Sequence, residues 1–319
     1  MREPFDTPLS GRPIRIEFSP CGRWLALTEQ PAQEPPRLTV FDVGTGGLLW
    51  STHCLSEEVG LYPHGMAFGP SGDEIANVEP DFSISRREAR TGKLKSSIDV
   101  PEHESLTGIR YSPDGKSLLI RRPHKDILVV DCASGAIVDR VSDRCLGMFR
   151  TVHGDVWLEA EPSRELVLRG GPRSPPMLTL RGLAETPLTP VTSSDGRYIA
   201  VPGGDRVVYF WDLARGGLPG KCVGHESVIR AVGFSPDSRT IISQSDDGTV
   251  RFWNIATRAE LLKLGTAQNP IMCMGLNPKG DLLVLGAHCH GRWGLQIHRL
   301  GPDRDSLPKQ FDPPPSSER

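Results

Sequence analysis

The chain has 319 residues, of which 37 are Lys or Arg and 39 are Asp or Glu, so its formal net charge at pH 7 is −2. This balance argues against a broad basic surface for nucleic acid, because phosphate binding depends on accumulated Lys and Arg. Glycine and proline, 34 and 29 residues, make up about a fifth of the chain, which predicts many turns joined by short strands.

The sequence shows no sign of a membrane or secretory segment. No apolar run approaches the roughly 18 residues that a membrane helix needs, and the first six residues contain no apolar stretch typical of a signal peptide. The seven cysteines include no Cys-x-x-Cys pair, which argues against a disulfide framework and a zinc ribbon. We therefore expect a cytoplasmic protein with reduced thiols.

A turn phrase recurs along the chain: an aromatic or apolar residue, a small polar residue, proline, a polar residue and glycine. Proline sets φ for a tight turn, the polar residue binds the local backbone, and glycine completes the reversal. The first clear copy is Phe18-Ser19-Pro20-Cys21-Gly22. The last position of the phrase falls at residues 22, 72, 115, 154, 196, 238 and 280, so the chain contains seven repeat units.

Each unit is predicted to be a four-stranded meander. Apolar strands flank the turn phrase, as in Ile229–Phe234 and Thr240–Ser245, and a third strand ends in a bulky residue followed by an acid or amide. An acid or amide there suits an Asx-type turn into a fourth strand. Such a sheet has two apolar faces, which neighbouring units would cover if they were arranged radially. The strand-ending pairs are Phe41-Asp42, Arg87-Glu88, Val130-Asp131, Trp211-Asp212 and Trp253-Asn254.

One stretch carries a specific resemblance. Gly224-His225, Phe234-Ser235-Pro236-Asp237, Asp247-Gly248-Thr249 and Trp253-Asn254 resemble the WD40 repeat, and the likeness extends more weakly over about residues 14–300. It implies an all-β fold, a seven-bladed β-propeller of four-stranded antiparallel blades. We expect one domain over residues 1–302 and a mobile Pro-rich tail at 303–319, with repeat units at 14–58, 59–102, 103–142, 143–183, 184–224, 225–267 and 268–302.

Two parts of the predicted propeller are less regular. The seventh blade needs an outer strand from elsewhere, and residues 1–13, with a strand at Pro4–Leu9, are favoured over Leu307–Phe311. In the fourth blade, Gly170-Gly171-Pro172 and Pro175-Pro176 stand where a third strand should end, so the sequence leaves open whether this blade is a full four-stranded sheet or a ragged one.

The resemblance also implies a structural hydrogen-bond tetrad of His225, Ser243, Asp247 and Trp253. The preceding unit has Trp211 and Asp205 but places Val201 and Leu183 where the serine and histidine belong. The same His, Ser and Asp would also fit a hydrolase triad. The structural interpretation is favoured, because geometry and roles define a triad, and these positions match an internal network of the family.

In the family, the loops before the first strand and between the second and third strands form one rim, often the binding face. Met, Arg and aromatic residues there are typical of protein contacts. Two alternatives stay open: the apolar members plug a narrow channel, and the loop around residues 121–125 is a solvated face. The candidate partner-binding residues are Arg12, Tyr62, His64, Thr107, Arg121, Arg122, Lys125, Arg230, Asp246 and Met272.

No catalytic or metal signature is evident. His288 and His290 alternate beside Cys289, but a closed metal site needs further ligands at defined spacing. The sequence lacks the Gly-x-Ser-x-Gly, phosphate-loop and His-Glu-x-x-His motifs. We therefore expect a monomeric, non-catalytic scaffold that binds a protein or peptide, with no catalytic residues, metal, cofactor, nucleic acid or membrane. The alternatives are a propeller hydrolase or lactonase and a sensor domain of a larger signalling protein.

Overall fold

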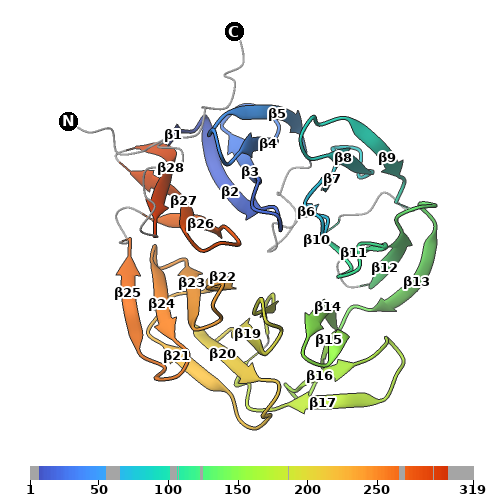
Figure 1. Ribbon diagram of the computed structural model, residues 1–319, viewed down its shortest axis with the longest axis vertical. Helices are drawn as coiled ribbons and strands as arrows, with labels where there is room; N and C mark the ends of the chain where they lie inside the picture. Colours follow the sequence, from blue (N-terminus) through green and yellow to red (C-terminus); the bar gives the residue numbers. More distant parts are fainter. Residues whose placement is uncertain are drawn as a thin grey trace. The chain divides into compact units, whose positions relative to one another are not determined.

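The computed structural model describes residues 7–54, 65–100, 106, 108–122, 125–185, 187–265, 270–289 and 291–300. All regular secondary structure within these residues is β, in seven four-stranded sheets (Figure 1). This count confirms the predicted fold class, a seven-bladed β-propeller with four-stranded antiparallel blades. Within the same residues, the structure contains no helix with the length and apolar character needed to cross a membrane.

The chain divides into two compact units, and the first comprises Met1–Arg140 and Met272–Arg319. Three of its sheets follow the chain order, and in the fourth the most N-terminal strand lies outermost. The strands are β2 (Gly11–Phe18), β3 (Trp24–Pro31), β4 (Arg37–Asp42) and β5 (Leu48–His53); β6 (Met66–Phe68), β7 (Glu74–Val78), β8 (Ile84–Glu88) and β9 (Leu94–Ile98); β10 (Gly108–Tyr111), β11 (Ser117–Arg121), β12 (Asp126–Asp131) and β13 (Ile137–Ser142); and β1 (Thr7–Pro8), β28 (Arg292–Arg299), β27 (Leu282–Cys289) and β26 (Ile271–Leu276).

The N-terminal segment supplies the outer strand of the sheet β1–β28–β27–β26, which is the seventh blade in the order of the repeats. Strand β1 pairs antiparallel with β28, with Thr7 opposite Leu295 and Pro8 opposite Gly294. The sequence favoured this segment for closure, and the competing Leu307–Phe311 lies outside the described residues. Because proline lacks an N–H, Pro8 is tolerated at this edge position, where no further strand pairs with it.

The second unit, Val141–Ile271, contains three sheets. Their strands are β14 (Cys145–Thr151), β15 (Gly154–Ala160), β16 (Leu166–Arg169) and β17 (Pro176–Leu180); β18 (Val191–Thr192), β19 (Tyr198–Pro202), β20 (Val207–Asp212) and β21 (Gly220–Val223); and β22 (Ile229–Phe234), β23 (Thr240–Ser245), β24 (Val250–Asn254) and β25 (Glu260–Leu264).

The fourth repeat unit, 143–183, whose completeness the sequence left open, forms a four-stranded sheet. Strand β16 pairs with both β15 and β17, so this sheet has its full complement of strands. The Gly-Pro-rich stretch forms the connection between β16 and β17, and its last proline, Pro176, is the first residue of β17. Beside it, the pairing of β16 with β17 shifts register between Leu168 and Arg169, a bulge that absorbs an extra residue.

The turn phrase works as its residue types suggest. In the hairpin between β10 and β11, the Ser112 hydroxyl donates to Asp114 (2.6 Å) and accepts from the backbone N–H of Ser117 (2.9 Å). Gly115 follows at φ 73°, where a Cβ would be strained. The hairpin between β22 and β23 repeats the serine and aspartate contacts through Ser235 and Asp237, but Ser238 replaces the glycine at φ 55°.

The turn between the third and fourth strands is equally regular. Asp131 accepts hydrogen bonds from the backbone and hydroxyl of Ser134, at 2.8 and 2.7 Å. Asn254 accepts the same two bonds from Thr257, at 2.9 and 3.1 Å. The acid or amide therefore makes the Asx-type turn expected from the sequence. The residue four positions after the acid or amide has positive φ in five sheets. These residues are Gly46, Gly92, Gly135, Gly216 and Arg258.

The hydrophobic core lies between the faces of neighbouring sheets. In the second unit, Leu158 and Leu168 of one sheet pack with Val201 and Trp211 of the next in a buried cluster. A second cluster joins Phe210 to Ile241 and Trp253. The two middle strands carry most of this burial, whereas four of the five residues in the outer strand β25 are exposed. Each sheet thus buries the two apolar faces that it cannot cover alone.

Candidate functional site

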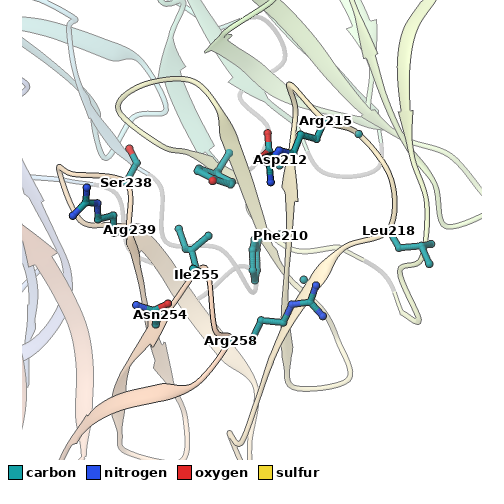
Figure 2. Close-up of a pocket in the computed structure, with 13 residues that line it drawn as sticks. Phe210, Asp212, Arg215, Leu218, Ser238, Arg239, Asn254, Ile255 and Arg258 are labelled. Carbon is teal, nitrogen blue, oxygen red and sulfur yellow. Dashed lines mark ion pairs between the residues drawn. The ribbon is translucent and has the colours of Figure 1, made fainter.

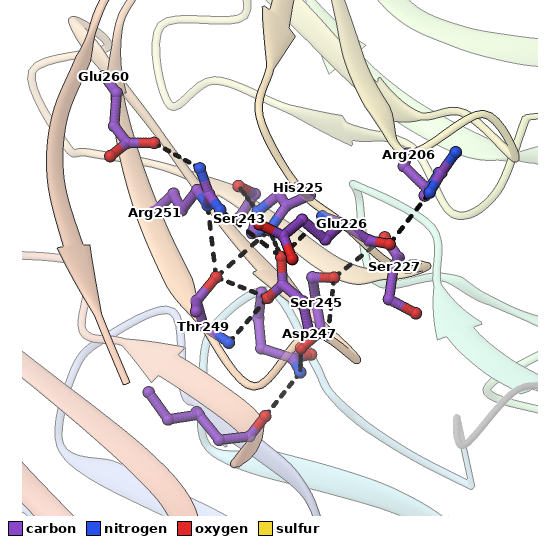
Figure 3. A network of polar contacts seen from close by, with 12 residues as sticks. Arg206, His225, Glu226, Ser227, Ser243, Ser245, Asp247, Thr249, Arg251 and Glu260 are labelled. Atoms are coloured by element: carbon purple, nitrogen blue, oxygen red, sulfur yellow. Dashed lines mark hydrogen bonds and ion pairs between the residues drawn. The ribbon is translucent and has the colours of Figure 1, made fainter. Parts of the chain in front are cut away.

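The predicted tetrad residues are hydrogen bonded to one another in and beside the sheet β22–β25, and Figure 3 shows three of them, His225, Ser243 and Asp247. His225 follows β21 and contacts Asp247 through Nδ1 (2.8 Å) and Ser243 of β23 through Nε2 (2.7 Å). The indole Nε1 of Trp253 in β24 donates to the Ser243 hydroxyl oxygen (2.8 Å). One chain of contacts therefore links the loop before the sheet to its two middle strands.

The charges of this network follow from burial and hydrogen bonding. Burial alone would raise the pKa of Asp247, but hydrogen bonds from Thr249, the Glu226 backbone and His225 outweigh it and hold that pKa well below its ordinary value. Burial lowers the pKa of His225 more than Asp247 raises it, so the imidazole is neutral at pH 7. A neutral imidazole that donates from Nδ1 to a carboxylate must accept at Nε2. The Ser243 hydroxyl consequently donates to His225 and accepts from Trp253.

This geometry suits a structural connection and not a nucleophile. The Ser243 residue has 0% exposure, as does the His225 side chain, so a substrate carbonyl cannot reach the hydroxyl. The hydroxyl oxygen also accepts the Trp253 N–H. Nucleophilic attack requires an accessible oxygen next to its base and a place for the reacting atom. The triad interpretation of these residues therefore has no geometric support.

In the preceding sheet, β18–β21, the buried polar groups have other hydrogen-bond partners. The indole N–H of Trp211 donates to the backbone carbonyl of Arg181 (3.2 Å), and Asp205 accepts a hydrogen bond from the Tyr209 hydroxyl (2.6 Å). Val201 and Leu183, where the neighbouring sheet has serine and histidine, are buried in the apolar cluster. Equivalent repeat positions thus hold a polar network in one sheet and apolar packing in the next.

In the second unit, the predicted contact residues Arg230 and Asp246 form an exposed ion pair. The Arg230 guanidinium donates to both carboxylate oxygens of Asp246, at 2.6 to 3.0 Å, and the two side chains are 40% and 32% exposed. Arg230 is the extra residue of a β-bulge, since Ile229 pairs with Ser245 and Ala231 with Gln244. A bulge redirects a side chain out of the regular alternation of a strand.

The first unit contains the other candidates. Arg12 and Lys125 are exposed, and Arg121 and Met272 are partly buried at the end of β11 and near the start of β26. Arg122 is only 2% exposed and forms an ion pair with Asp126 (2.6 Å), so its guanidinium lies inside the protein and not on the expected loop surface. Tyr62, His64 and Thr107 lie outside the described residues.

Sequence reasoning missed two buried charge networks of the first unit. Glu29, fully buried, pairs with Arg37 (2.9 Å), and burial raises the pKa of Glu29 despite that arginine. Glu74 accepts hydrogen bonds from Arg86, Lys95 and Tyr111, which connects two sheets. These residues lie in strands or beside them, and neighbouring sheets determine which of them are buried. The amino-acid sequence alone therefore does not indicate that these charges are buried.

The histidines at the end of β27 do not form a metal site in the described part of the chain. His288 packs against the Trp293 ring at 4.4 Å between ring centres, and His290 lies outside the described residues. In the parts of the chain that the structure describes, no three His, Cys, Asp or Glu side chains gather as metal ligands.

Comparisons with known proteins agree with this architecture. The model of the WD domain, G-beta repeat, matches residues 217–254, which run from β21 through β24 and contain the four tetrad residues. Nuclear distribution protein PAC1 of Arthroderma otae is 34% identical over 219 residues, which is 68% of this chain and 43% of that protein. PAC1 of Tuber melanosporum is 38% identical over 89 residues, 28% of this chain and 19% of that protein.

A further relative is Echinoderm microtubule-associated protein-like 4 of Xenopus laevis, 31% identical over 105 residues, 32% of this chain and 11% of that protein. The chain therefore aligns with less than half the length of each of these relatives. The same family is supported by four observations: the repeat spacing, the seven four-stranded sheets, the hydrogen-bonded tetrad and these matches. The chain belongs to the WD40-repeat family.

Proposed function

We propose that this chain is a non-catalytic scaffold that binds a partner protein or peptide, and that the end of β22 and β23 carrying Arg230 and Asp246 takes part in that contact. The observation that carries the proposal is the bulge at Arg230, which presents an exposed, oriented guanidinium at a strand end. Arg is among the residues enriched at the energetic centres of protein interfaces.

Either member of the Arg230–Asp246 ion pair can be replaced by a charged group of a partner. Exposed ion pairs contribute only about 0–1 kcal/mol, because water screens them and ordering two side chains costs entropy. A partner carboxylate can therefore take the place of Asp246 at little cost, and a partner cation can in turn take Asp246. Between encounters, the three contacts hold the guanidinium in place, which reduces the entropy lost on binding.

The relatives support the general role. One is named as associated with microtubules and others as nuclear distribution proteins. We extend to this chain only the role of contacting other macromolecules, since the alignment covers a part of each relative. A propeller places variable loops on a rigid support, and binding residues are concentrated on such loops.

A matched pair of charge reversals tests the proposal. Arg150 and Asp155 form a similarly bidentate, exposed pair (2.8 and 2.9 Å), but at the tip of the β14–β15 hairpin, the turn-phrase end of that sheet. In a pull-down, the recovered partner proteins are quantified for the wild type and for each variant. We expect the partners of the wild type to be lost with Arg230→Glu and retained with Arg150→Glu. Restoring the pair in reverse with Arg230→Glu plus Asp246→Arg should not restore capture.

Two results would count against this assignment. Undiminished capture by Arg230→Glu would remove the residue from the contact. Equal loss with Arg150→Glu would show that the captured proteins respond to net charge and not to this position. Circular dichroism and thermal melting of each variant establish that the fold is intact.

A further inference from the structure

The second unit also contains a cavity at the opposite end of β22 and β23, where the turn phrase lies. Its volume is about 490 Å³, and it is formed by turns of two neighbouring sheets. Phe210, Ile255 and Tyr198 contribute apolar surface, and Phe210 packs so closely on Gly220 that a side chain at Gly220 would overlap its ring. Figure 2 shows Phe210 and Ile255 between the arginines on either side.

The edges of this cavity are cationic. Arg215, Arg239 and Arg258 line it, and the one acidic lining residue, Asp212, is paired with Arg197 (2.7 Å) and with Arg215 (3.8 Å). Among the residues that the structure describes, the side chains of Arg239 and Arg258 have no carboxylate within ion-pair distance. Three guanidiniums against one neutralised carboxylate leave the site positively charged, although the whole chain has a net charge of −2.

Two of the five non-glycine residues with positive φ in the described part of the chain lie in the wall of this cavity. Ser238 and Arg258, both in the cavity wall, have φ of 55° and 62° at turn positions where other sheets have glycine. A left-handed conformation costs a non-glycine residue roughly 1–2 kcal/mol. Strained residues are concentrated at functional sites, where a side chain is needed despite its cost. Glycine would relieve the strain at residue 258 but would remove the guanidinium from the cavity.

We propose that this cavity, called here the arginine cavity, binds an acidic segment of a partner protein in which a carboxylate side chain lies next to an apolar one. The carboxylate binds Arg258 and Arg239, whose planar N–H groups match its two oxygens. The apolar neighbour packs on Phe210 and on Leu218, which is 81% exposed at the cavity edge. This site is additional to the contact proposed at Arg230.

Charge complementarity favours a short acidic peptide over nucleic acid as the occupant. Nucleic acid binding needs positive charge along a groove, whereas these arginines surround one compact cavity with an apolar floor. Arg clusters that recognise acidic motifs combine charge-assisted bonds with a neighbouring pocket for specificity.

The test uses fluorescence anisotropy with the full chain and a fluorescein-labelled decapeptide of alternating glutamate and leucine. We expect binding that weakens about tenfold or more with Arg258→Glu and with Arg239→Glu, the value of one lost charge-assisted contact. Arg150→Glu makes the same charge change at the β14–β15 hairpin of another sheet and should leave the affinity unchanged. The matching glutamine–leucine peptide should bind at least about tenfold more weakly.

Four results would overturn the proposal: no binding of the glutamate–leucine peptide to the wild type, equal binding of the glutamine–leucine peptide, equal weakening by Arg150→Glu, or much tighter binding of a phosphoserine–leucine peptide, which would assign the cavity to phosphate. Because the contact proposed at Arg230 and the arginine cavity are tested by different variants, either can fail without the other. Thermal melting of both cavity variants checks that a loss of affinity is not a loss of fold.

Discussion

The Ser243 hydroxyl is the point at which the tetrad is most sensitive to change. It accepts from Trp253 (2.8 Å) and donates to His225 (2.7 Å), and the residue has no exposed surface. Ser243→Ala removes both bonds and leaves an indole N–H and an imidazole nitrogen buried without a partner. Each such group costs about 1–3 kcal/mol, so we expect the free energy of unfolding to fall by about 2–6 kcal/mol.

Urea denaturation measures this loss as a lower midpoint with an unchanged m-value. Ser163→Ala is the matched control, because Ser163 is exposed and a surface substitution changes stability by no more than about 0.5 kcal/mol. A loss below about 1 kcal/mol for Ser243→Ala would refute the reasoning, since it would mean that the two buried groups find other partners or water.

The equivalent position of the preceding sheet provides the reverse experiment. Val201 has 0% exposure and stands 42 residues before Ser243, with Leu183 where the neighbouring sheet has His225. Val201→Ser would bury a hydroxyl without the histidine that accepts its proton in the neighbouring sheet, so it should also destabilise the protein, by about 1–3 kcal/mol. Serine is therefore favourable at this repeat position only together with its histidine partner.

Three further outcomes follow from the structure. Arg258→Gly should stabilise the protein by about 0.5–1 kcal/mol in urea denaturation, because glycine adopts φ 62° without strain although it adds entropy to the unfolded chain. The depressed pKa of Asp247 contributes stability that is present above its unfolded pKa of about 4 and lost as pH falls toward the folded pKa, so Asp247→Asn should lower stability at neutral pH and flatten the acid limb of a stability–pH curve. Arg37→Ala should cost about 3–5 kcal/mol at neutral pH by leaving the Glu29 carboxylate buried and unpaired, and because the pKa of Glu29 is raised, that cost should shrink as acid protonates it.

The sequence determines the backbone framework well because its signals are local. Proline, serine, aspartate and glycine of each turn phrase interact within a few residues, as Ser112, Asp114 and Gly115 do, so their spacing alone predicts the hairpins. The tetrad could be predicted only through the family resemblance, since His225 and Ser243 are 18 residues apart and meet through strand pairing.

Burial of charged residues could not be predicted in the same way. Arg122 was expected on a loop surface, but its guanidinium is buried against Asp126, four residues later. The arginine cavity was also missed, because Arg215, Arg239 and Arg258 come from three separate turns that the packing of two sheets brings together. Such sites depend on contacts between repeats, and the pattern within one repeat contains no record of them.

The repeat itself shows where function is best sought in this chain. A position that serves only the turn should have the residue that the turn prefers, as Gly46, Gly92, Gly135 and Gly216 do. Arg258 departs from that rule at a cost in stability, and it lines a cavity together with Ser238, which also stands where other sheets have glycine. If Arg258→Gly raises stability while it abolishes binding of the acidic peptide, the strain at residue 258 is explained by the ligand. If Arg258→Gly raises stability and leaves binding of the acidic peptide intact, Arg258 has no role in that binding, and the strain at this position has no functional explanation.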